Sequence, residues 1–545
     1  MAGEGEVREN AGGAGHGRLA GEDAAGEAHF VAELDRWLGE HRQAMIEAVQ
    51  ALCRIRSVQD EPAPGQPFGP GVAEALEWIR RHAEAMGFRT RNLDGYAVDA
   101  EIGEGEEWIA VLGHVDVVPE GTGWTYPPYG AEIHDGRIYA RGAVDDKGPT
   151  VAALYALKAV ADLALAQGRR PARRARLVVG GNEESGFECV KYYFAREPQP
   201  ALGFSPDAMF PLVNAEKGMW TFRLSLELPG EAQAAGTGWR ARLLRLEGGT
   251  RVNVVPEHAV AELAVEGPGA PSLDELARRL QDGGGPGRAR ITARVEGERL
   301  VVEARGAAAH AMHPEKGINA VAGLLNALAR ALGPALPRSS DLAFLAGAGA
   351  RTDGSGFGIA VADQVSGPLT VNLGLIRLVG EHPLQGAASL AAGAPGEAAA
   401  PEASRGAGRA GTAGAILYAD CNVRYPVTAS AQDLARRVVA ALAGTGWRFE
   451  SREDMPPHHV PDDSEIVRRL LAVYREEAGD PAARPLAIGG GTYARVLRNG
   501  VAFGPLFPGQ RELAHEPDEY WSIDDLVRCV RIYARALYRL MFAPR

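Results

Sequence analysis

Residues 180–186 read Gly-Gly-Asn-Glu-Glu-Ser-Gly, a glycine-rich turn that carries two adjacent carboxylates. The apolar residues Leu177-Val178-Val179 precede the turn and predict a strand that is buried on both faces. Adjacent acids repel each other, so a buried Glu183-Glu184 pair needs a nearby cation or a shared proton. An exposed pair needs neither, because acidic dipeptides are common on surfaces. The choice between these interpretations depends on the rest of the chain.

Four other segments place imidazole or carboxylate groups at similar strand ends and turns. They are Gly-His-Val-Asp (113–116), Gly-Ala-Val-Asp-Asp-Lys-Gly (142–148), Ser-Pro-Asp-Ala (205–208) and Ala-His-Glu-Pro (514–517). Side chains two residues apart in a strand point the same way, so His114 could bind a metal while Asp116 fixes its imidazole. Structural interpretations stay open, since His114 could be a packed strand-end residue. Asp145 and Asp146 could simply be acids at the positive end of a helix.

The combined motifs predict a set of metal-binding and proton-transferring residues. The set is His114, Asp145, Glu183, Glu184, Asp207 and His515. Imidazole and carboxylate donors without thiolates suit zinc, manganese or cobalt. Two ions about 3.5–4 Å apart that share a carboxylate would use more acids than a single catalytic zinc does. In that arrangement one glutamate of the pair binds a cation and the other acts as a base.

Composition limits the class of protein. The net charge of −12 argues against nucleic acid or an anionic membrane as a partner. We find no apolar run close to the roughly 20 residues of a membrane span, and the first six residues lack the features of a secretory signal. The four cysteines, Cys53, Cys189, Cys421 and Cys529, are widely separated, which predicts free buried thiols in a reducing compartment. We therefore expect a cytoplasmic protein.

The order of patterns predicts a discontinuous domain with an insertion. Residues 1–28 are mostly Gly, Ala and Glu and predict a disordered tail. Residues 29–217 and 458–545 alternate strand and helix patterns, which predicts an α/β domain with a mixed, largely parallel sheet sandwiched by helices. Residues 218–457 predict a separate α+β domain, interrupted by an Ala- and Gly-rich, disordered insertion at 386–414.

A weak internal repeat occurs within the α+β domain. Residues 272–280 read Ser-Leu-Asp-Glu-Leu-Ala-Arg-Arg-Leu, and residues 430–438 read Ser-Ala-Gln-Asp-Leu-Ala-Arg-Arg-Val. Each segment has the capping pattern of a helix start, with an acid three residues after a serine. Such starts are common, so chance similarity stays an alternative. A true repeat would mean two related α+β halves.

The ordered motifs resemble a known family, the dinuclear zinc metallopeptidases. This family includes aminoacylases, succinyl-diaminopimelate desuccinylases, glutamate carboxypeptidases and bacterial peptidase V-type dipeptidases. The resemblance extends from about residue 30 to the end of the chain. It is strongest to the peptidase V dipeptidases, on Glu-Lys-Gly (216–218), Ala-His (309–310) with Pro-Glu-Lys-Gly-Ile-Asn-Ala (314–320), and Asn-Val-Arg-Tyr-Pro (422–426).

The resemblance implies a role for each residue of the metal site. Two zinc ions, with manganese or cobalt as alternatives, would be bridged by Asp145. His114 and Asp207 would hold one ion, and Glu184 and His515 would hold the other. Asp116 would orient His114, and the peptide bond after Asp145 would be cis. Glu183 would be the general base that takes a proton from the attacking water and passes it to the leaving amine.

The resemblance also makes residues 218–457 the lid domain of such an enzyme. Asn253 and His310 would reach over the metals, and His310 would stabilise the tetrahedral oxyanion. Arg424 would bind the C-terminal carboxylate of the substrate. Without the family, a surface position for Arg424 and a core position for His310 are the simpler interpretations. His313 lies close to His310, so which of the two faces the metals is open.

The function that follows is hydrolysis of unsubstituted dipeptides. Deacylation of N-acyl amino acids on the same metal site is the alternative, and an inactive metal-binding protein is a third interpretation. In dimeric relatives a shorter lid pairs between subunits. The long lid and its internal repeat therefore lead us to expect a monomer.

Overall fold

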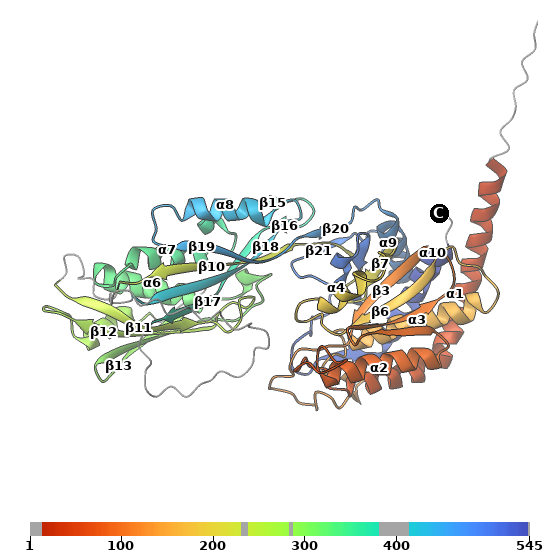
Figure 1. Cartoon of the computed structure of the whole chain (residues 1–545), viewed down its shortest axis with the longest axis horizontal. Helices are drawn as coiled ribbons and strands as arrows, with labels where there is room; N and C mark the ends of the chain where they lie inside the picture. The colour runs from red at the N-terminus through yellow and green to blue at the C-terminus, as the bar shows by residue number, and fades with distance from the viewer. Residues whose placement is uncertain (1–12, 230–237, 283–286, 381–413, 543–545) are drawn as a thin grey trace, which may run out of the picture. The chain divides into compact units, whose positions relative to one another are not determined.

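The computed structural model describes residues 13–229, 238–282, 287–380 and 414–542 (Figure 1). The chain divides into two units. The first contains residues up to Asn214, then His459–Leu486 and Gly491–Arg545, and the second contains Ala215–His458 and Ala487–Gly490. The domain boundaries expected from the sequence, 217/218 and 457/458, lie close to the points where the chain passes between the units, 214/215 and 458/459. The expected insertion at 386–414 lies, apart from Gly414, outside the described residues.

A mixed sheet of nine strands forms the centre of the first unit. Its order is β1-β2-β6-β3-β7-β22-β9-β20, with β21 also paired to β9. These strands are β1 (Arg89–Leu93), β2 (Ala97–Ile102), β3 (Trp108–His114), β6 (Arg174–Gly180), β7 (Leu202–Ser205), β9 (Val213–Glu216), β20 (His458–His459), β21 (Leu486–Ile488) and β22 (Gly500–Ala502). The central pairs β6·β3, β3·β7 and β7·β22 are parallel, whereas β1·β2 and β2·β6 are antiparallel. The predicted mixed sheet is confirmed; the part described as largely parallel is its centre, because β22·β9 on the other side is antiparallel too.

The helices of the first unit pack against this sheet. They are α1 (Gly13–Cys53), α2 (Pro70–Ala85), α3 (Lys147–Val160), α4 (Glu188–Phe194), α9 (Glu465–Ala478) and α10 (Ile523–Phe542), with a π turn at Ala161–Leu165 and a 3-10 turn at Tyr493–Val496. Helix α3 lies on β3 and β6 and is covered by α1 and α10, whereas α2 and α4 lie against β2. Short strands β4 (Glu132–His134), β5 (Arg137–Tyr139), β8 (Ala208–Met209), β23 (Pro505–Leu506) and β24 (Tyr520–Ser522) form two small accessory sheets.

Burial of α3 corrects one expectation from composition. Among the described residues, the helical stretch Lys147–Leu165 is long and apolar enough to cross a membrane, contrary to the expectation that the chain has no such run. Of its most apolar window, 72% is buried inside the structure. A helix that is covered by its own domain has no need of a polar face. The apolar composition is therefore that of a core helix.

The N-terminal helix is longer than predicted. Helix α1 begins at Gly13, so the expectation of a disordered tail is wrong from residue 13 onward, and residues 1–12 lie outside the described residues. Phe30 and Leu34 anchor the helix in the core, and a helix that is already formed there can extend toward the N-terminus without a new nucleation step. Glu27, within the supposed tail, accepts hydrogen bonds from Arg535 and Arg539 of α10 at 3.0 and 2.7 Å.

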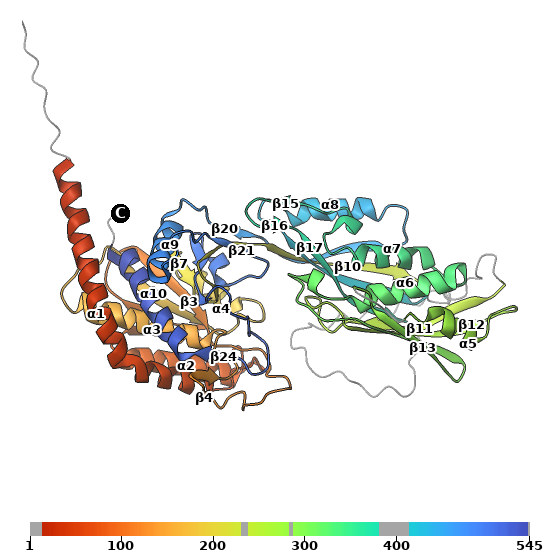
Figure 2. The ribbon, with the colours of Figure 1, turned by 180° about the vertical axis from the view of Figure 1, so that it is seen from behind.

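The second unit is an antiparallel sheet of eight strands in the order β13-β14-β12-β11-β17-β18-β10-β19. The strands are β10 (Gly218–Glu227), β11 (Arg240–Gly248), β12 (His258–Glu266), β13 (Arg290–Glu296), β14 (Arg299–Arg305), β17 (Thr370–Val379), β18 (Ile416–Tyr425) and β19 (Arg448–Met455). The helices are α5 (Leu273–Leu280), α6 (Ala320–Leu332), α7 (Ser339–Gly349) and α8 (Ala431–Ala441), and β15 (Ala362–Asp363) pairs with β16 (Gly367–Pro368). Figure 2 shows the same strands from behind.

This sheet consists of two similar halves, as a true internal repeat requires. In one half α5 connects β12 to the edge strand β13, and in the other half α8 connects β18 to the opposite edge strand β19. Ser272 and Ser430 cap the two helices by accepting hydrogen bonds from the amides of Glu275 and Asp433, both at 3.2 Å. The halves meet at the antiparallel pair β11·β17 in the middle of the sheet. The sequence similarity of α5 and α8 therefore corresponds to equivalent positions in the fold.

Candidate metal centre

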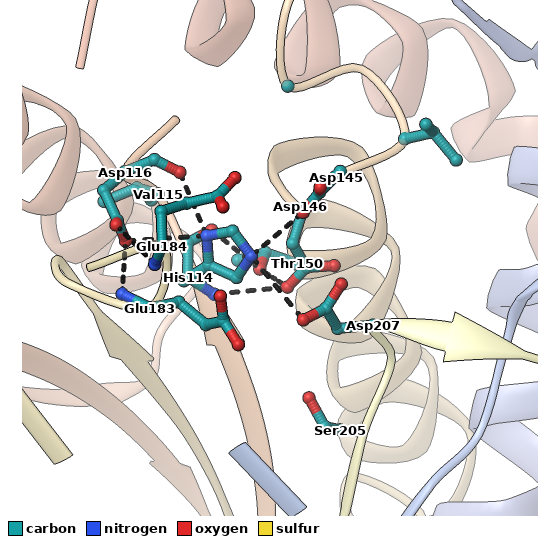
Figure 3. Close-up of polar contacts among 12 residues, drawn as sticks. His114, Val115, Asp116, Asp145, Asp146, Thr150, Glu183, Glu184, Ser205 and Asp207 are labelled. Carbon is teal, nitrogen blue, oxygen red and sulfur yellow. Dashed lines mark hydrogen bonds and ion pairs between the residues drawn. The ribbon is translucent and has the colours of Figure 1, made fainter. Parts of the chain in front are cut away.

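The predicted ligands gather where the central parallel strands end. His114 ends β3 and lies beside Gly180, the last residue of β6, and Glu183 and Glu184 follow in the next turn. Asp207 follows β7, the other neighbour of β3. Carboxyl ends of adjacent parallel strands meet at one edge of a sheet, where α/β proteins place their ligands. Figure 3 shows the side chains of these residues converging from the three strand ends and from the loop before α3.

Six side chains form two groups, each able to hold a metal ion. One group contains His114, Glu183 and Asp207, and the other contains Asp145, Glu184 and His515. In each group the ligand atoms lie within 4.8 Å of one another. The structure thus brings all six predicted residues together, although they come from separate segments of the chain.

The Asp145 carboxylate lies between the two groups. Its Oδ1 atom is 3.2 Å from Nε2 of His114, and its Oδ2 atom is 3.2 Å from Nε2 of His515. His114 Nε2 is also 3.7 Å from Asp207, and His515 Nε2 is 3.1 Å from Glu184. One oxygen toward each imidazole is the placement that a bridging carboxylate requires. The peptide bond between Asp145 and Asp146 is cis, as expected.

The fully buried imidazole of His114 fits a metal ligand. Its Nδ1 atom is 3.0 Å from the carbonyl oxygen of Asp116, which accepts a hydrogen bond when Nδ1 carries the proton. Nε2 then faces the carboxylate oxygens of Asp145 and Asp207, at 3.2 and 3.7 Å. Negative oxygens around Nε2 favour a positive charge there, which either a proton or a metal ion can supply.

The electrostatics of the site also indicate a place for cations. Burial and the charge of Asp145 raise the pKa of Glu184 to about 7. Burial, with Asp145 again adding repulsion, raises the pKa of Asp207 to about 6. Burial and the charge of Asp207 raise the pKa of Glu183 well above its ordinary value. Crowded carboxylates resist ionisation together, and bound cations remove that penalty.

The two imidazoles of the centre show the complementary effect. Burial lowers the pKa of His114, but hydrogen bonds to Asp116 and Asp145 outweigh it and raise that pKa well above its ordinary value. Burial likewise lowers the pKa of His515, but hydrogen bonds to Asp145 and Glu184 outweigh it and raise that pKa to about 11. In the metal-free protein both imidazoles therefore hold a proton in the place that a metal ion would take.

Asp116 does more than the sequence predicted for it. Its Oδ1 atom is 3.5 Å from Nδ1 of His114, in keeping with an orienting role. Its two carboxylate oxygens also accept hydrogen bonds from the backbone amides of Glu183 and Glu184, each at 3.0 Å. Asp116 thus fixes the Glu-Glu turn against β3, a long-range contact with no local signal in the sequence.

A buried ion pair beside the centre was missed altogether. Arg141 and Glu519 are 2% and 0% exposed and lie 2.7 Å apart. Arg141 stands directly before the 142–148 motif, but a lone Glu in a turn after Pro517 and Asp518 is typical of a surface residue. Only the fold shows that Glu519 is buried against the Asp145 loop.

The three predicted lid residues all belong to the second unit. Residues 254 and 310 form an isolated bridge, which brings the segments of Asn253 and His310 together, and His310 is exposed. Arg424 is only 5% exposed and donates hydrogen bonds to Asn422 and to the carbonyl oxygen of Gly489. A surface position for Arg424 and a core position for His310 are therefore both wrong. The reach of these residues over the metals stays a prediction.

The amino-acid sequence matches a known peptidase family and is similar to proteins named as dipeptidases. Residues 110–539 match the family described as Peptidase family M20/M25/M40. The chain is 40% identical over 504 residues to "Putative dipeptidase YtjP" of Bacillus subtilis (strain 168), an alignment that covers 92% of this chain and 97% of that protein.

Solved structures show the same fold at low sequence identity. Aminoacylhistidine dipeptidase from Vibrio alginolyticus has a TM-score of 0.51 at 15% identity, covering 92% of this chain and 97% of that one. Human carnosine dipeptidase 1 has a TM-score of 0.50 at 14% identity, covering 94% and 98%.

Proposed function

Since the chain belongs to peptidase family M20/M25/M40, we propose that it is a dipeptidase that hydrolyses unsubstituted dipeptides at a centre of two metal ions. The observation that carries this proposal is the Asp145 carboxylate, which directs one oxygen to His114 and the other to His515. Zinc, manganese and cobalt all suit the donors, and zinc is our first choice.

The two groups of residues would hold the ions separately. His114 and Asp207 would bind one, Glu184 and His515 would bind the other, and Asp145 would bind both. When bound, such ions polarise the peptide carbonyl group and lower the pKa of the attacking water. The strand ends and the Asp116 contacts would keep His114, Glu183 and Glu184 in place when the ions bind.

Glu183 is the proton-transferring residue in this proposal. It takes the proton of the attacking water on its carboxylate and delivers it to the nitrogen of the leaving amine. Its position beside His114 and Asp207 supports this role, since a base must lie within reach of the water.

The second unit would act as the lid. His310 would donate a hydrogen bond to the oxyanion, and Asn253 would contact the substrate beside it. Arg424 would bind the substrate carboxylate with its planar guanidinium group. The paired halves of the sheet support a monomer, because they place within one chain the kind of pairing that otherwise needs two subunits.

We also propose that the protein is cytoplasmic and acts on small peptides, without nucleic acid or membrane as a partner. All four cysteines are free and buried, which suits a reducing compartment.

A paired assay tests the reaction. Metal-loaded protein is given a panel of dipeptides and the N-acetylated form of each, and release of amino acids is followed. We expect hydrolysis of the free dipeptides. Preference for the acetylated forms would instead support the deacylase, and turnover of neither would support an inactive metal-binding protein.

A further inference from the structure

We infer that the buried Arg141–Glu519 ion pair is a positioning device for the metal centre, and that it serves the His515 group more than the His114 group. This inference rests on the two-metal centre proposed above. Neither residue was predicted to bind metal or substrate.

Glu519 holds the loop that carries Asp145. Its Oε2 atom accepts hydrogen bonds from the amide of Gly142 at 3.0 Å and from Arg141 at 2.7 Å. Its Oε1 atom accepts from the amides of Val144 at 2.9 Å and Asp145 at 3.3 Å. One fully buried carboxylate therefore binds three backbone amides of a short segment that ends at the bridging ligand.

Arg141 holds the loop that carries His515. It donates to the carbonyl oxygen of His515 at 3.2 Å and to that of Glu516 at 3.4 Å. His515 has a φ of 67°, in the left-handed region that a non-glycine residue adopts only at some cost. The hydrogen bonds to the carbonyl groups support this conformation. The ion pair thus joins two loops that are 374 residues apart in sequence.

The His114 group has supports of its own. His114 is part of β3, is fully buried, and contacts Asp116 through Nδ1. The His515 side chain is 52% exposed and lies in a loop outside the central sheet. Loss of the ion pair therefore weakens a restraint on the backbone of the His515 loop, whereas the contacts that hold His114 remain.

Metal titration of the full chain tests the inference. Protein freed of metal by a chelator is titrated with Co²⁺ and followed by calorimetry and visible absorption. We expect the wild type to bind two ions. In Glu519→Gln, one ion should bind as in the wild type and the other roughly 10- to 100-fold more weakly, the usual effect of losing a residue that supports a ligand.

Matched variants make the result specific. Glu101→Gln changes another carboxylate that pairs with a buried arginine, Arg176, on β6, and should leave both affinities unchanged. Arg141→Lys keeps the charge but loses the planar fork, so it should repeat the selective loss. In a His515→Ala background, Glu519→Gln should weaken the remaining site less than it weakens the His515 group in the otherwise unchanged chain, because the remaining site shares only Asp145 with the ion pair.

The outcomes separate this inference from the proposed function. Equal weakening of both sites, or of neither, in Glu519→Gln would overturn the inference. If Glu519→Gln does not fold, the Co²⁺ titration of Arg141→Lys replaces it: selective weakening of one site supports the inference, and equal weakening of both sites or of neither overturns it. A wild type that binds two Co²⁺ ions but cleaves no dipeptide would refute the proposed function alone, whereas a wild type that binds none would overturn both.

Discussion

The two ligand groups of the centre are built in different ways. The His114 group is held by the ends of adjacent parallel strands, and its imidazole is fully buried. The His515 group depends on a loop, and its imidazole is half exposed. One group is therefore held by the sheet itself, whereas the other lies in a loop that Arg141 contacts through two carbonyl oxygens.

The largest expected effect concerns Glu183, which lies in the His114 group. Glu183→Gln should lower kcat by about 10²- to 10⁴-fold, because a general base contributes about that much. Both metal ions should stay bound, as measured by metal analysis of the purified variant. Glu188→Gln, at an exposed glutamate paired with Lys191, is the control and should keep full activity. Loss of one ion from Glu183→Gln would make this residue a ligand instead.

A substitution at Asp116 should weaken metal binding in both ligand groups, whereas a substitution at Glu519 should weaken mainly the His515 group. Its carboxylate contacts His114 and also holds the amides of Glu183 and Glu184. Asp116→Asn should therefore weaken both sites by roughly 10- to 100-fold in a Co²⁺ titration. A loss confined to one site would show that the Glu-Glu turn keeps its position without Asp116.

The pH dependence of metal binding should differ between the groups. In the metal-free protein the pKa is about 7 for Glu184 and about 6 for Asp207. Metals bind the deprotonated carboxylates, so affinity falls as the pH is lowered through each pKa, by about tenfold per pH unit for each proton displaced. In titrations made on either side of pH 7 and of pH 6, both sites should weaken across this range because each ion also displaces an imidazole proton. The pH dependence should steepen first for the His515 group, below about pH 7, and then for the His114 group, below about pH 6, and steepening in the reverse order would contradict the prediction.

The smallest effect is expected for a substitution at Glu27. Its side chain forms hydrogen bonds with α10 and not with either ligand group. Glu27→Gln removes one acceptor from Arg535 and Arg539, which also pair with Glu476. Glu476 remains a partner of both arginines and the glutamine carbonyl oxygen can still accept, so the free energy of unfolding should fall by about 1 kcal/mol, the size of one hydrogen bond. Chemical denaturation measures the change, and both metal affinities should stay the same.

Much of the fold and of the centre could be predicted from the sequence because the relevant signals are local. Strands such as β3 and β6 are short apolar runs, and the ligands follow them within a few residues. The parallel order of strands then brings their ends together. The family resemblance supplied the roles of individual residues, including the bridging position of Asp145.

The missed features depend on contacts between distant segments or on weak patterns. The burial of Glu519 and the second role of Asp116 need partners that are far away in sequence. Strand β19 is an exposed edge strand rich in charge, so it lacks alternation of apolar residues. Helix α7 contains Gly347 and Gly349, which disfavour a helix unless tertiary packing supports it. The helical start of α1 was missed because Ala- and Glu-rich sequence also suits disorder.

The paired halves of the second unit have an evolutionary consequence. In a symmetric dimer every substitution appears twice, so both copies of a surface must change together. Within one chain, each half accumulates substitutions independently of the other. Here His310 follows β14 in one half and Arg424 lies on β18 in the other. Joining the halves in one polypeptide releases them from symmetry, so that under the proposed function each could specialise for a different end of a small substrate.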